Sequence, residues 1–190
     1  MDYELNLRVY TEDRSTASKA EIKAFLDWIQ EVAPSRIDAL KDFIEATDGG
    51  NPVLDFSRKS LGSLGEWFCT MVETRLRSDE EVLQIKRQQK FSIEIPSLEL
   101  TDRTLSLCFD LALYFATVML SQHPSLRWDC VTTGKRDINY GWPVLITFST
   151  SPLNPFLLMR TYAYGIAKGS KGEHRLIELY DIWSSKIIAV

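Results

Sequence analysis

One stretch of the chain, Leu105–Leu120, is apolar on nearly every side. Thr101 and Asp102 stand just before it as candidate N-cap residues, and Pro124 follows its end. The stretch has 16 residues, which is short for a membrane span, and both of its ends are marked. A helix that is apolar all round in a globular chain lies in the core. The sequence therefore predicts a central helix at about residues 104–122, covered by the rest of the chain.

Helical spacing of apolar side chains predicts further helices at about residues 18–32, 35–48, 58–77, 154–167 and 176–188, with one or two exposed turns in 78–90. Pro34 ends the first of these helices, because proline lacks the backbone N–H that a helix interior needs. Ser35–Asp38 resembles a capping box that starts the next one. Gly62 and Gly65 in the third are either tolerated there or allow another backbone to approach closely. For 176–188 a helix fits the spacing somewhat better than a strand.

Alternation of apolar and polar side chains predicts strands at residues 3–9, 91–95, 126–130 and 144–148. Together with the helices, these strands give an α+β fold: an antiparallel or mixed sheet of about four to five strands, packed by helices around the central helix. A chain of 190 residues fits a single globular domain, 1–190, in which residues 1–52 form a possible helical elaboration.

The acidic side chains are concentrated at the N-terminus. The net charge is −4, and residues 1–57 hold 12 acidic and 6 basic side chains. This balance argues against nucleic acid as a ligand and leaves two interpretations of the first two helices: a solvated surface, or a surface for a basic partner. The candidate partner-binding residues are Glu31, Asp38, Asp42 and Glu45.

The sequence contains no catalytic or metal-binding motif that stands above chance. Two histidines and three cysteines without a CxxC spacing do not suggest a zinc site, and we expect no metal and no cofactor. Asp110, the one charge inside the central helix, is either a cleft residue near His123 and Trp128 or the partner of an arginine such as Arg160. The glycines and lysines of residues 165–172 resemble a phosphate-binding loop in composition only, and a surface loop is the simpler interpretation.

Two aromatic residues, Tyr140 and Trp142, flank Gly141 in a predicted loop. Large aromatics in such a place often anchor a binding partner. They can equally hold their own loop against the protein. We therefore include Tyr140 and Trp142 among the candidate partner-binding residues, with both interpretations open.

Several short segments resemble a known group of domains. Val53–Leu61 reads VLDFSRKSL, and it is followed by Leu111–Phe115, Leu126–Trp128, Pro143–Leu145 and Asn154–Phe156. In this order the segments, which span about residues 53–160, are similar to small bacterial α/β domains of uncharacterised function, some of which are immunity proteins encoded beside polymorphic toxins. The resemblance implies a protein that binds and neutralises a toxin, and it brings no catalytic residues.

These observations predict a protein-binding module rather than an enzyme: an immunity protein that neutralises a bacterial toxin by direct binding, with a basic toxin domain as the candidate partner. Its N-terminus lacks a basic start followed by an apolar run, so we expect a cytoplasmic location and no membrane partner. The alternative is a small-molecule-binding domain or enzyme with a pocket near Asp110, His123 and Trp128.

Overall fold

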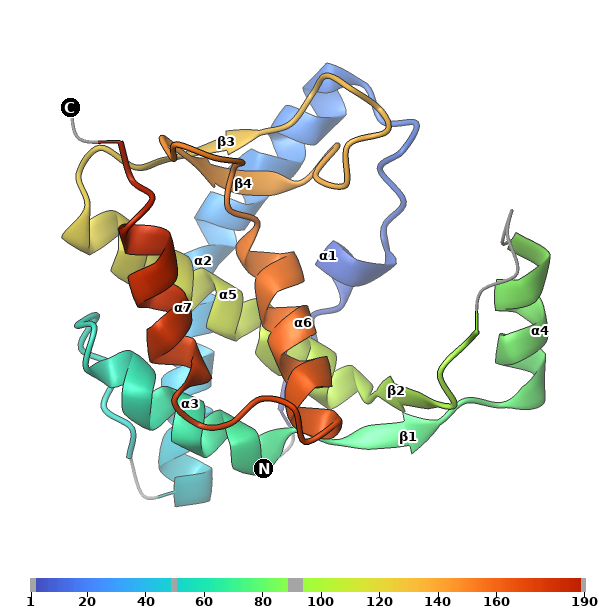
Figure 1. Ribbon diagram of the computed structural model, residues 1–190, viewed down its shortest axis with the longest axis horizontal. Coiled ribbons are helices and arrows are strands. Elements are labelled where there is room, and N and C mark those ends of the chain that lie inside the picture. The colour runs from blue at the N-terminus through green and yellow to red at the C-terminus, as the bar shows by residue number, and fades with distance from the viewer. Residues whose placement is uncertain (1–2, 49–50, 89–93, 189–190) are drawn as a thin grey trace.

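The computed structural model describes residues 3–48, 51–88 and 94–188 and shows a helical body from which a thin arm extends (Figure 1). The elements in chain order are α1 (Arg8–Thr11), α2 (Lys19–Asp48), α3 (Ser60–Met71), β1 (Thr74–Leu76), α4 (Asp79–Gln88), β2 (Leu98–Leu100), α5 (Asp102–Gln122), β3 (Arg127–Cys130), β4 (Pro143–Ile146), α6 (Pro155–Ala167) and α7 (Arg175–Ser184). The fold is therefore α+β, and helices form most of it.

Helix α5 is the centre of the hydrophobic core, as its apolar sequence predicts. Helices α2, α6 and α7 pack against it, and the Thr101 side chain caps it by accepting a hydrogen bond from the Thr104 backbone N–H. In the described part of the chain it is the one helix long and apolar enough to cross a membrane, but 78% of that apolar window is buried inside the fold. Its apolar faces are thus covered by the protein itself.

Helix α2 contradicts the predicted break at Pro34, because it continues through the proline for 30 residues. Ser35 does not start a new helix with a capping box; its hydroxyl donates to the Val32 carbonyl oxygen at 2.9 Å. The buried side chains before and after the proline stay in phase on one face: Ile22, Phe25, Leu26, Ile29, Ile37, Leu40, Phe43 and Ile44. Burying each of these is worth about 1.5–3 kcal/mol, which together outweighs the ~3 kcal/mol cost of an interior proline.

The predicted sheet of four to five strands is wrong. The described residues form two separate two-stranded antiparallel sheets, β1–β2 and β3–β4. The predictions at 126–130 and 144–148 correspond to β3 and β4. The predicted strand at 91–95 falls mostly on residues 91–93, outside the described residues, and the strand near it is β2.

Residues 3–9 do not form the predicted strand either. They lie against α5 and then enter α1, and their polar groups bond to side chains instead of to a neighbouring strand. The Asn6 backbone N–H donates to Ser106 Oγ at 2.8 Å, and the Tyr3 hydroxyl donates to Asp110. An alternating pattern predicts a strand only where a partner strand is within reach, and here the neighbour is a helix.

The segment that leads into α3 is anchored on α5 by polar groups. The Tyr114 hydroxyl accepts from the Phe56 backbone N–H at 3.0 Å and lies 2.6 Å from Ser60 Oγ. The Asp55 carboxylate accepts from the Ser57 backbone N–H at 2.9 Å, and hydrogen bonding to Ser57, first through its side chain and then through its backbone, lowers the pKa of Asp55. The helix ends at Met71, six residues before the predicted end, and the chain turns out into the arm.

The arm consists of β1, α4 and β2, and Figure 1 shows it standing away from the helical body. Leu76 and Leu98 face each other across its two strands and are both exposed, as is Leu83 on α4. None of the described side chains of α4 is buried. On the ribbon, Arg75 binds both Glu81 and Glu99. The arm therefore pairs several of its charges internally and leaves Leu76, Leu83 and Leu98 in solvent.

Candidate functional site

The acidic candidates of the first two predicted helices lie on one helix and on one face of it. Because α2 does not break at Pro34, Glu31, Asp38, Asp42 and Glu45 follow one another at steps of seven, four and three residues. Such steps return to the same side of an α-helix. Asp27 extends the row by one turn, and all five side chains are exposed. We call these five residues the acidic stripe; it runs for about 27 Å along α2.

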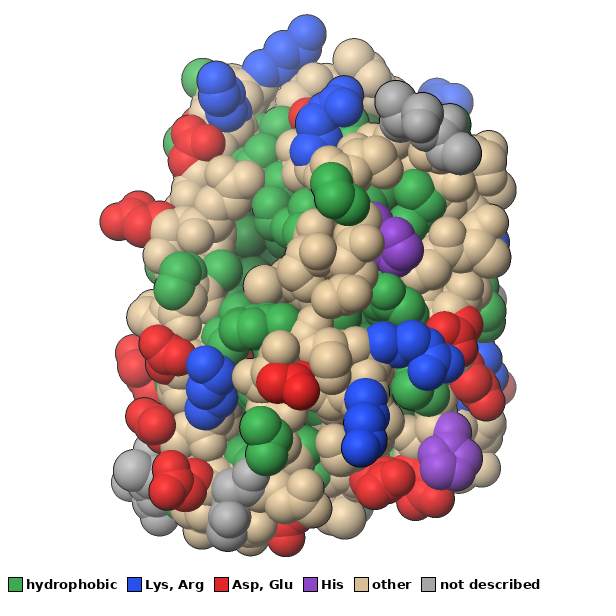
Figure 2. All heavy atoms as spheres, turned by 90° about the vertical axis from the view of Figure 1, so that its left-hand side faces the viewer, with side chains coloured by type: hydrophobic (Ala, Val, Ile, Leu, Met, Phe, Trp, Pro, Cys, Tyr) green, Lys and Arg blue, Asp and Glu red, His purple; other side chains and the backbone are tan. Residues whose placement is uncertain are grey.

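Most members of the acidic stripe have no ion-pair partner among the described residues, as is also true of other exposed acidic side chains such as Glu66 and Glu80. Among the residues that the structure describes, Asp38 is the one stripe member in an ion pair, with Lys41 at 3.3 Å. Elsewhere, arginine partners hold Glu12, Glu73, Glu81, Glu99 and Asp181. Figure 2 shows acidic side chains mainly in the lower half of the face it presents, with lysine and arginine side chains among them. The stripe thus carries charge that the chain itself leaves largely uncompensated.

Tyr140 and Trp142 contact other parts of the chain, away from the acidic stripe. The Tyr140 hydroxyl donates to the Ala17 carbonyl oxygen at 3.4 Å, and the Trp142 ring lies 4.6 Å from the Arg14 guanidinium. Gly141 between them has φ +74°, and a Cβ there would lie 2.9 Å from Arg14 Cβ. Both aromatics are half-buried. Their contacts hold the β3–β4 loop against residues 14–17.

Asp110 forms a buried ion pair, but with Arg36 of α2 and not with Arg160. Arg36 Nε and Nη2 donate to the two carboxylate oxygens at 2.9 and 2.8 Å, and the Tyr3 hydroxyl donates a third hydrogen bond. Burial raises the pKa of the Asp110 carboxyl. Arg160 lies instead with its guanidinium over the Tyr10 ring. Arg36 occupies a position in phase with the buried face of α2, and this was the signal in the sequence that could have identified it.

The three residues of the proposed small-molecule pocket have separate partners. Asp110 has no exposed surface, so a ligand could not reach it without displacing the N-terminal segment. His123 Nε2 lies 3.1 Å from both the Tyr180 hydroxyl and Ser184 Oγ, and burial lowers the pKa of this histidine. The Trp128 ring stacks on Phe156. These contacts tie elements together and give no support to a common catalytic centre.

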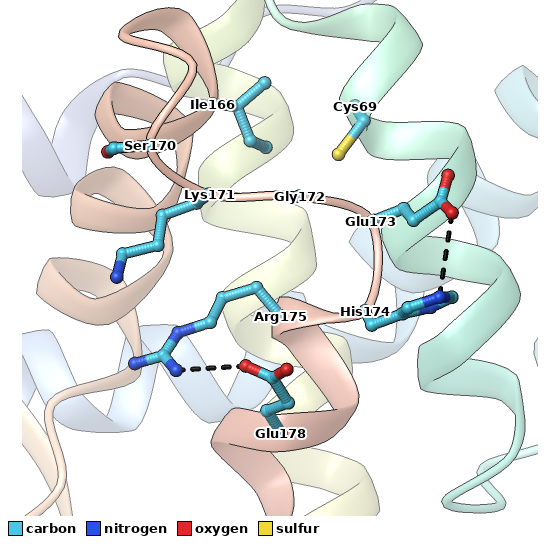
Figure 3. A pocket seen from close by; sticks show the side chains of 9 residues that line it. All are labelled: Cys69, Ile166, Ser170, Lys171, Gly172, Glu173, His174, Arg175 and Glu178. Carbon is cyan, nitrogen blue, oxygen red and sulfur yellow. Dashed lines mark hydrogen bonds and ion pairs between the residues drawn. The ribbon is translucent and has the colours of Figure 1, made fainter.

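A cavity of about 690 Å³ lies beside the glycine-rich loop between α6 and α7 (Figure 3). Its charged groups are paired with one another: Arg175 Nη1 with Glu178 at 3.1 Å, and His174 Nε2 with Glu173 at 3.7 Å. Figure 3 shows these two pairs on opposite sides of the loop, with Lys171 on the side of Arg175. Because the basic groups diverge and have acidic neighbours, this arrangement does not favour a phosphate.

Neither the contacts nor the comparisons with known proteins assign a reaction. In the ranges that the structure describes, histidine, cysteine, aspartate and glutamate side chains do not gather in groups that could hold a metal ion. The chain matches no protein-family model, and no curated protein and no solved structure is significantly similar to it. The features that remain to explain a function are the surfaces and pockets of this chain, and the acidic stripe is one of these surfaces.

Proposed function

We propose that the chain is a protein-binding module that neutralises a toxin by direct binding, with the acidic stripe of α2 as the contact surface for a basic toxin domain. The observation that carries the proposal is the row of exposed acidic side chains on one uninterrupted helix, four of which have no ion-pair partner among the described residues. The resemblance of residues 53–160 to small bacterial α/β domains, some of which are immunity proteins, supports a toxin as the kind of partner. The free thiols Cys69, Cys108 and Cys130 fit a cytoplasmic location.

The stripe has a physical cost that a basic partner would remove. Asp27 and Glu31, like Asp38 and Asp42, are four residues apart, and like charges at this spacing destabilise a helix. Positive side chains from a partner would turn this repulsion into attraction. A charged row of this length would also steer a basic protein during diffusion, which raises the association rate and makes it depend on salt.

The test uses two variants with the same change of net charge. In the first, Glu31, Asp42 and Glu45 of the stripe are replaced by lysine; Asp38 is kept because it pairs with Lys41. In the second, Glu66, Glu80 and Glu94 are replaced by lysine; these three are exposed and lie outside α2. Both sets keep the buried faces of the protein intact, so we expect both variants to fold like the original chain.

The partner is first captured from native lysate at low salt and identified by mass spectrometry, and its binding to each purified variant is then measured by surface plasmon resonance. We expect the stripe variant to associate at least about tenfold more slowly and the control variant to bind nearly as the original does. Expression of the captured protein should also arrest growth, and co-expression of the original chain should restore it. Equal binding by both variants would exclude the stripe, and a captured partner without toxicity would exclude the immunity role.

A further inference from the structure

A second cavity, of about 400 Å³, lies between α1, residues 12–17 and the first turns of α2. Phe25 and Trp28 form its aromatic part, with ring centroids 5.4 Å apart, and Ala24 lies beside them on the same helix. The Arg8 guanidinium lies over the Trp28 ring at 4.4 Å. Most of the remaining lining is polar or charged, and the volume is within the usual range of ligand pockets.

The polar group at the base of the cavity is Arg14, whose side chain is only 7% exposed. Its guanidinium lies between the rings of Phe25 and Trp142, at 4.4 and 4.6 Å, and Nη2 donates to the Val9 carbonyl oxygen at 2.8 Å. Within the described residues, the buried Nε and Nη1 atoms have no hydrogen-bond acceptor. Burial lowers the pKa of Arg14. Buried N–H groups without acceptors are rare and costly, so these donors are suited to an acceptor from outside the chain.

The carboxylate nearest to these donors is that of Glu12, which covers them without bonding to them. Glu12 Oε2 lies 3.7 Å from Arg14 Nη1 and 3.4 Å from Arg8 Nε. The first distance is beyond a hydrogen bond, and the Glu12 side chain is 42% exposed and therefore free to turn away. A ligand carboxylate that replaced Glu12 could accept hydrogen bonds from Arg14 and lie beside Arg8.

Two further carboxylates line the same cavity and would oppose a simple anion. Asp13 accepts from the Ser15 backbone N–H at 2.9 Å, and Glu21 accepts from the Ser18 backbone N–H at 2.8 Å. These bonds lower the pKa of both side chains, so both stay charged at neutral pH. Positive and negative groups together match a ligand that carries both charges.

We propose that this cavity binds a free α-amino acid with an apolar or aromatic side chain. Its carboxylate takes the place of the Glu12 carboxylate on Arg14 and Arg8, and its ammonium group faces Asp13 and Glu21. Its side chain packs on Phe25 and Trp28. This site is separate from the acidic stripe and does not depend on the function proposed for it.

The first experiment is isothermal titration calorimetry of the full chain with L-phenylalanine, L-tryptophan, L-leucine and L-methionine. Phenylacetate and phenethylamine serve as controls, because each retains the ring and only one of the two charges of phenylalanine. We expect saturable binding of at least one amino acid, and binding of phenylalanine at least about tenfold tighter than of either control, since each lost charge removes a charge-assisted hydrogen bond. Absence of saturable binding by all four amino acids would overturn the proposal.

Variants then locate the binding. Ala24→Phe should fill the cavity and abolish binding, whereas Ala20→Phe adds the same ring one turn earlier, at an exposed position outside the cavity, and should leave binding unchanged. Glu21→Gln keeps the capping box with Ser18 but removes a negative charge. It should therefore weaken the binding of phenylalanine, whose ammonium group faces Glu21, and should not weaken the binding of phenylacetate, which has no ammonium group. Glu12→Gln should tighten the binding of phenylalanine, because it removes the carboxylate that the ligand carboxylate has to replace. Equal binding by Ala24→Phe and Ala20→Phe would place the ligand elsewhere and refute the site.

Discussion

The molecule contains a bidentate arginine–carboxylate pair in two opposite surroundings, formed through Nε and Nη2 of Arg36 in one and through Nη1 and Nη2 of Arg75 in the other. Arg36 holds Asp110 with two hydrogen bonds, of 2.9 and 2.8 Å, and the two side chains are 7% and 0% exposed. Arg75 holds Glu81 with two hydrogen bonds, of 2.9 and 2.6 Å, and there the side chains are 43% and 35% exposed. The first pair joins α2 to α5 inside the body, and the second joins β1 to α4 on the arm. The comparison shows how much two bidentate pairs can differ in their exposure to water.

Surroundings decide what each pair contributes. In the body, water cannot solvate a carboxylate that loses its partner, so the two charges depend on each other. On the arm, water and salt replace a lost partner, and the pair holds only the local position of α4. The acidic stripe is on the outer face of the same helix that carries Arg36 on its inner face. On the buried face of α2, therefore, the charged side chain has a partner within the chain, and on the exposed face most of the acidic side chains remain free to bind another molecule.

The largest effect is expected from breaking the buried pair. Arg36→Ala leaves the Asp110 carboxylate buried without its cation, and the loss in the free energy of unfolding should be about 3–5 kcal/mol. Urea unfolding followed by circular dichroism measures this loss. A destabilisation below about 1 kcal/mol would mean that water reaches Asp110 in the variant, which contradicts its complete burial.

A matched replacement distinguishes the effect of the unpaired charge from the effect of lost packing at position 36. Arg36→Met combined with Asp110→Leu removes both charges, and Tyr3→Phe removes the hydroxyl that would otherwise lose its acceptor. Because replacing both members of a buried pair by apolar side chains is often neutral, this triple variant should recover most of the stability that Arg36→Ala loses. If it is as unstable as the single variant, the destabilisation comes from lost packing at position 36 and not from the unpaired charge.

A smaller effect, of opposite sign at two sites, is expected on α3. A Cβ at Gly65 would lie 2.4 Å from the Glu173 carbonyl oxygen, so Gly65→Ala should lower the free energy of unfolding by about 1–3 kcal/mol. At Gly62 the nearest atom is Ile177 Cδ1 at 3.9 Å, an ordinary contact, and Gly62→Ala should stabilise by up to about 1 kcal/mol through helix propensity. Thermal and urea unfolding of Gly65→Ala and Gly62→Ala measure these two changes in stability. Stabilisation by both substitutions would show that helix propensity, and not the approach of residue 173, determines both.

These glycines also illustrate how far the sequence alone could lead. The sequence left open whether Gly62 and Gly65 are simply tolerated or allow a second backbone to approach. The structure shows that a second backbone approaches Gly65. Thr101 was identified as a candidate cap from local sequence, and its side chain accepts from the Thr104 backbone N–H. Such features depend on residues within three or four positions, which is why the sequence predicts them.

Features that depend on distant residues were not predictable in this way. The local rule for Pro34 was overridden because α5 buries both halves of α2 on one face. The same error separated the acidic residues into two helices, so the sequence identified four members of the stripe without showing that they share a face. For Asp110 the sequence offered an arginine partner but not which one, since Arg36 is 74 positions away. Arg14 lies in a polar turn, and nothing in its local sequence marks it as buried.

The smallest effect is expected from the exposed pair, and it is local. The hydrogen bonds from Arg75, together with those from Ser78, lower the pKa of Glu81 from its ordinary value of 4.5 to about 2. A depressed carboxyl pKa means that the stabilising interaction is fully present above about pH 4.5 and is lost as the pH falls toward about 2. The Arg75–Glu81 contact between β1 and α4 should therefore weaken in that pH interval. The free energy of global unfolding, measured with urea at neutral pH, should barely change in Arg75→Ala.

Carboxyl titration by NMR measures this effect directly. In Arg75→Ala the pKa of Glu81 should rise toward its ordinary value, because the largest cause of its depression is removed. Arg77→Ala is the matched control on the same ribbon: Arg77 pairs with Glu99 at 2.9 Å and does not bond to Glu81, so the Glu81 pKa should stay low. An unchanged Glu81 pKa in Arg75→Ala would mean that the capping bonds from Ser78 are sufficient. Arg75 would then not hold the Glu81 carboxylate in solution as it does in the structure, and the exposed pair would differ from the buried pair in its contacts as well as in its burial.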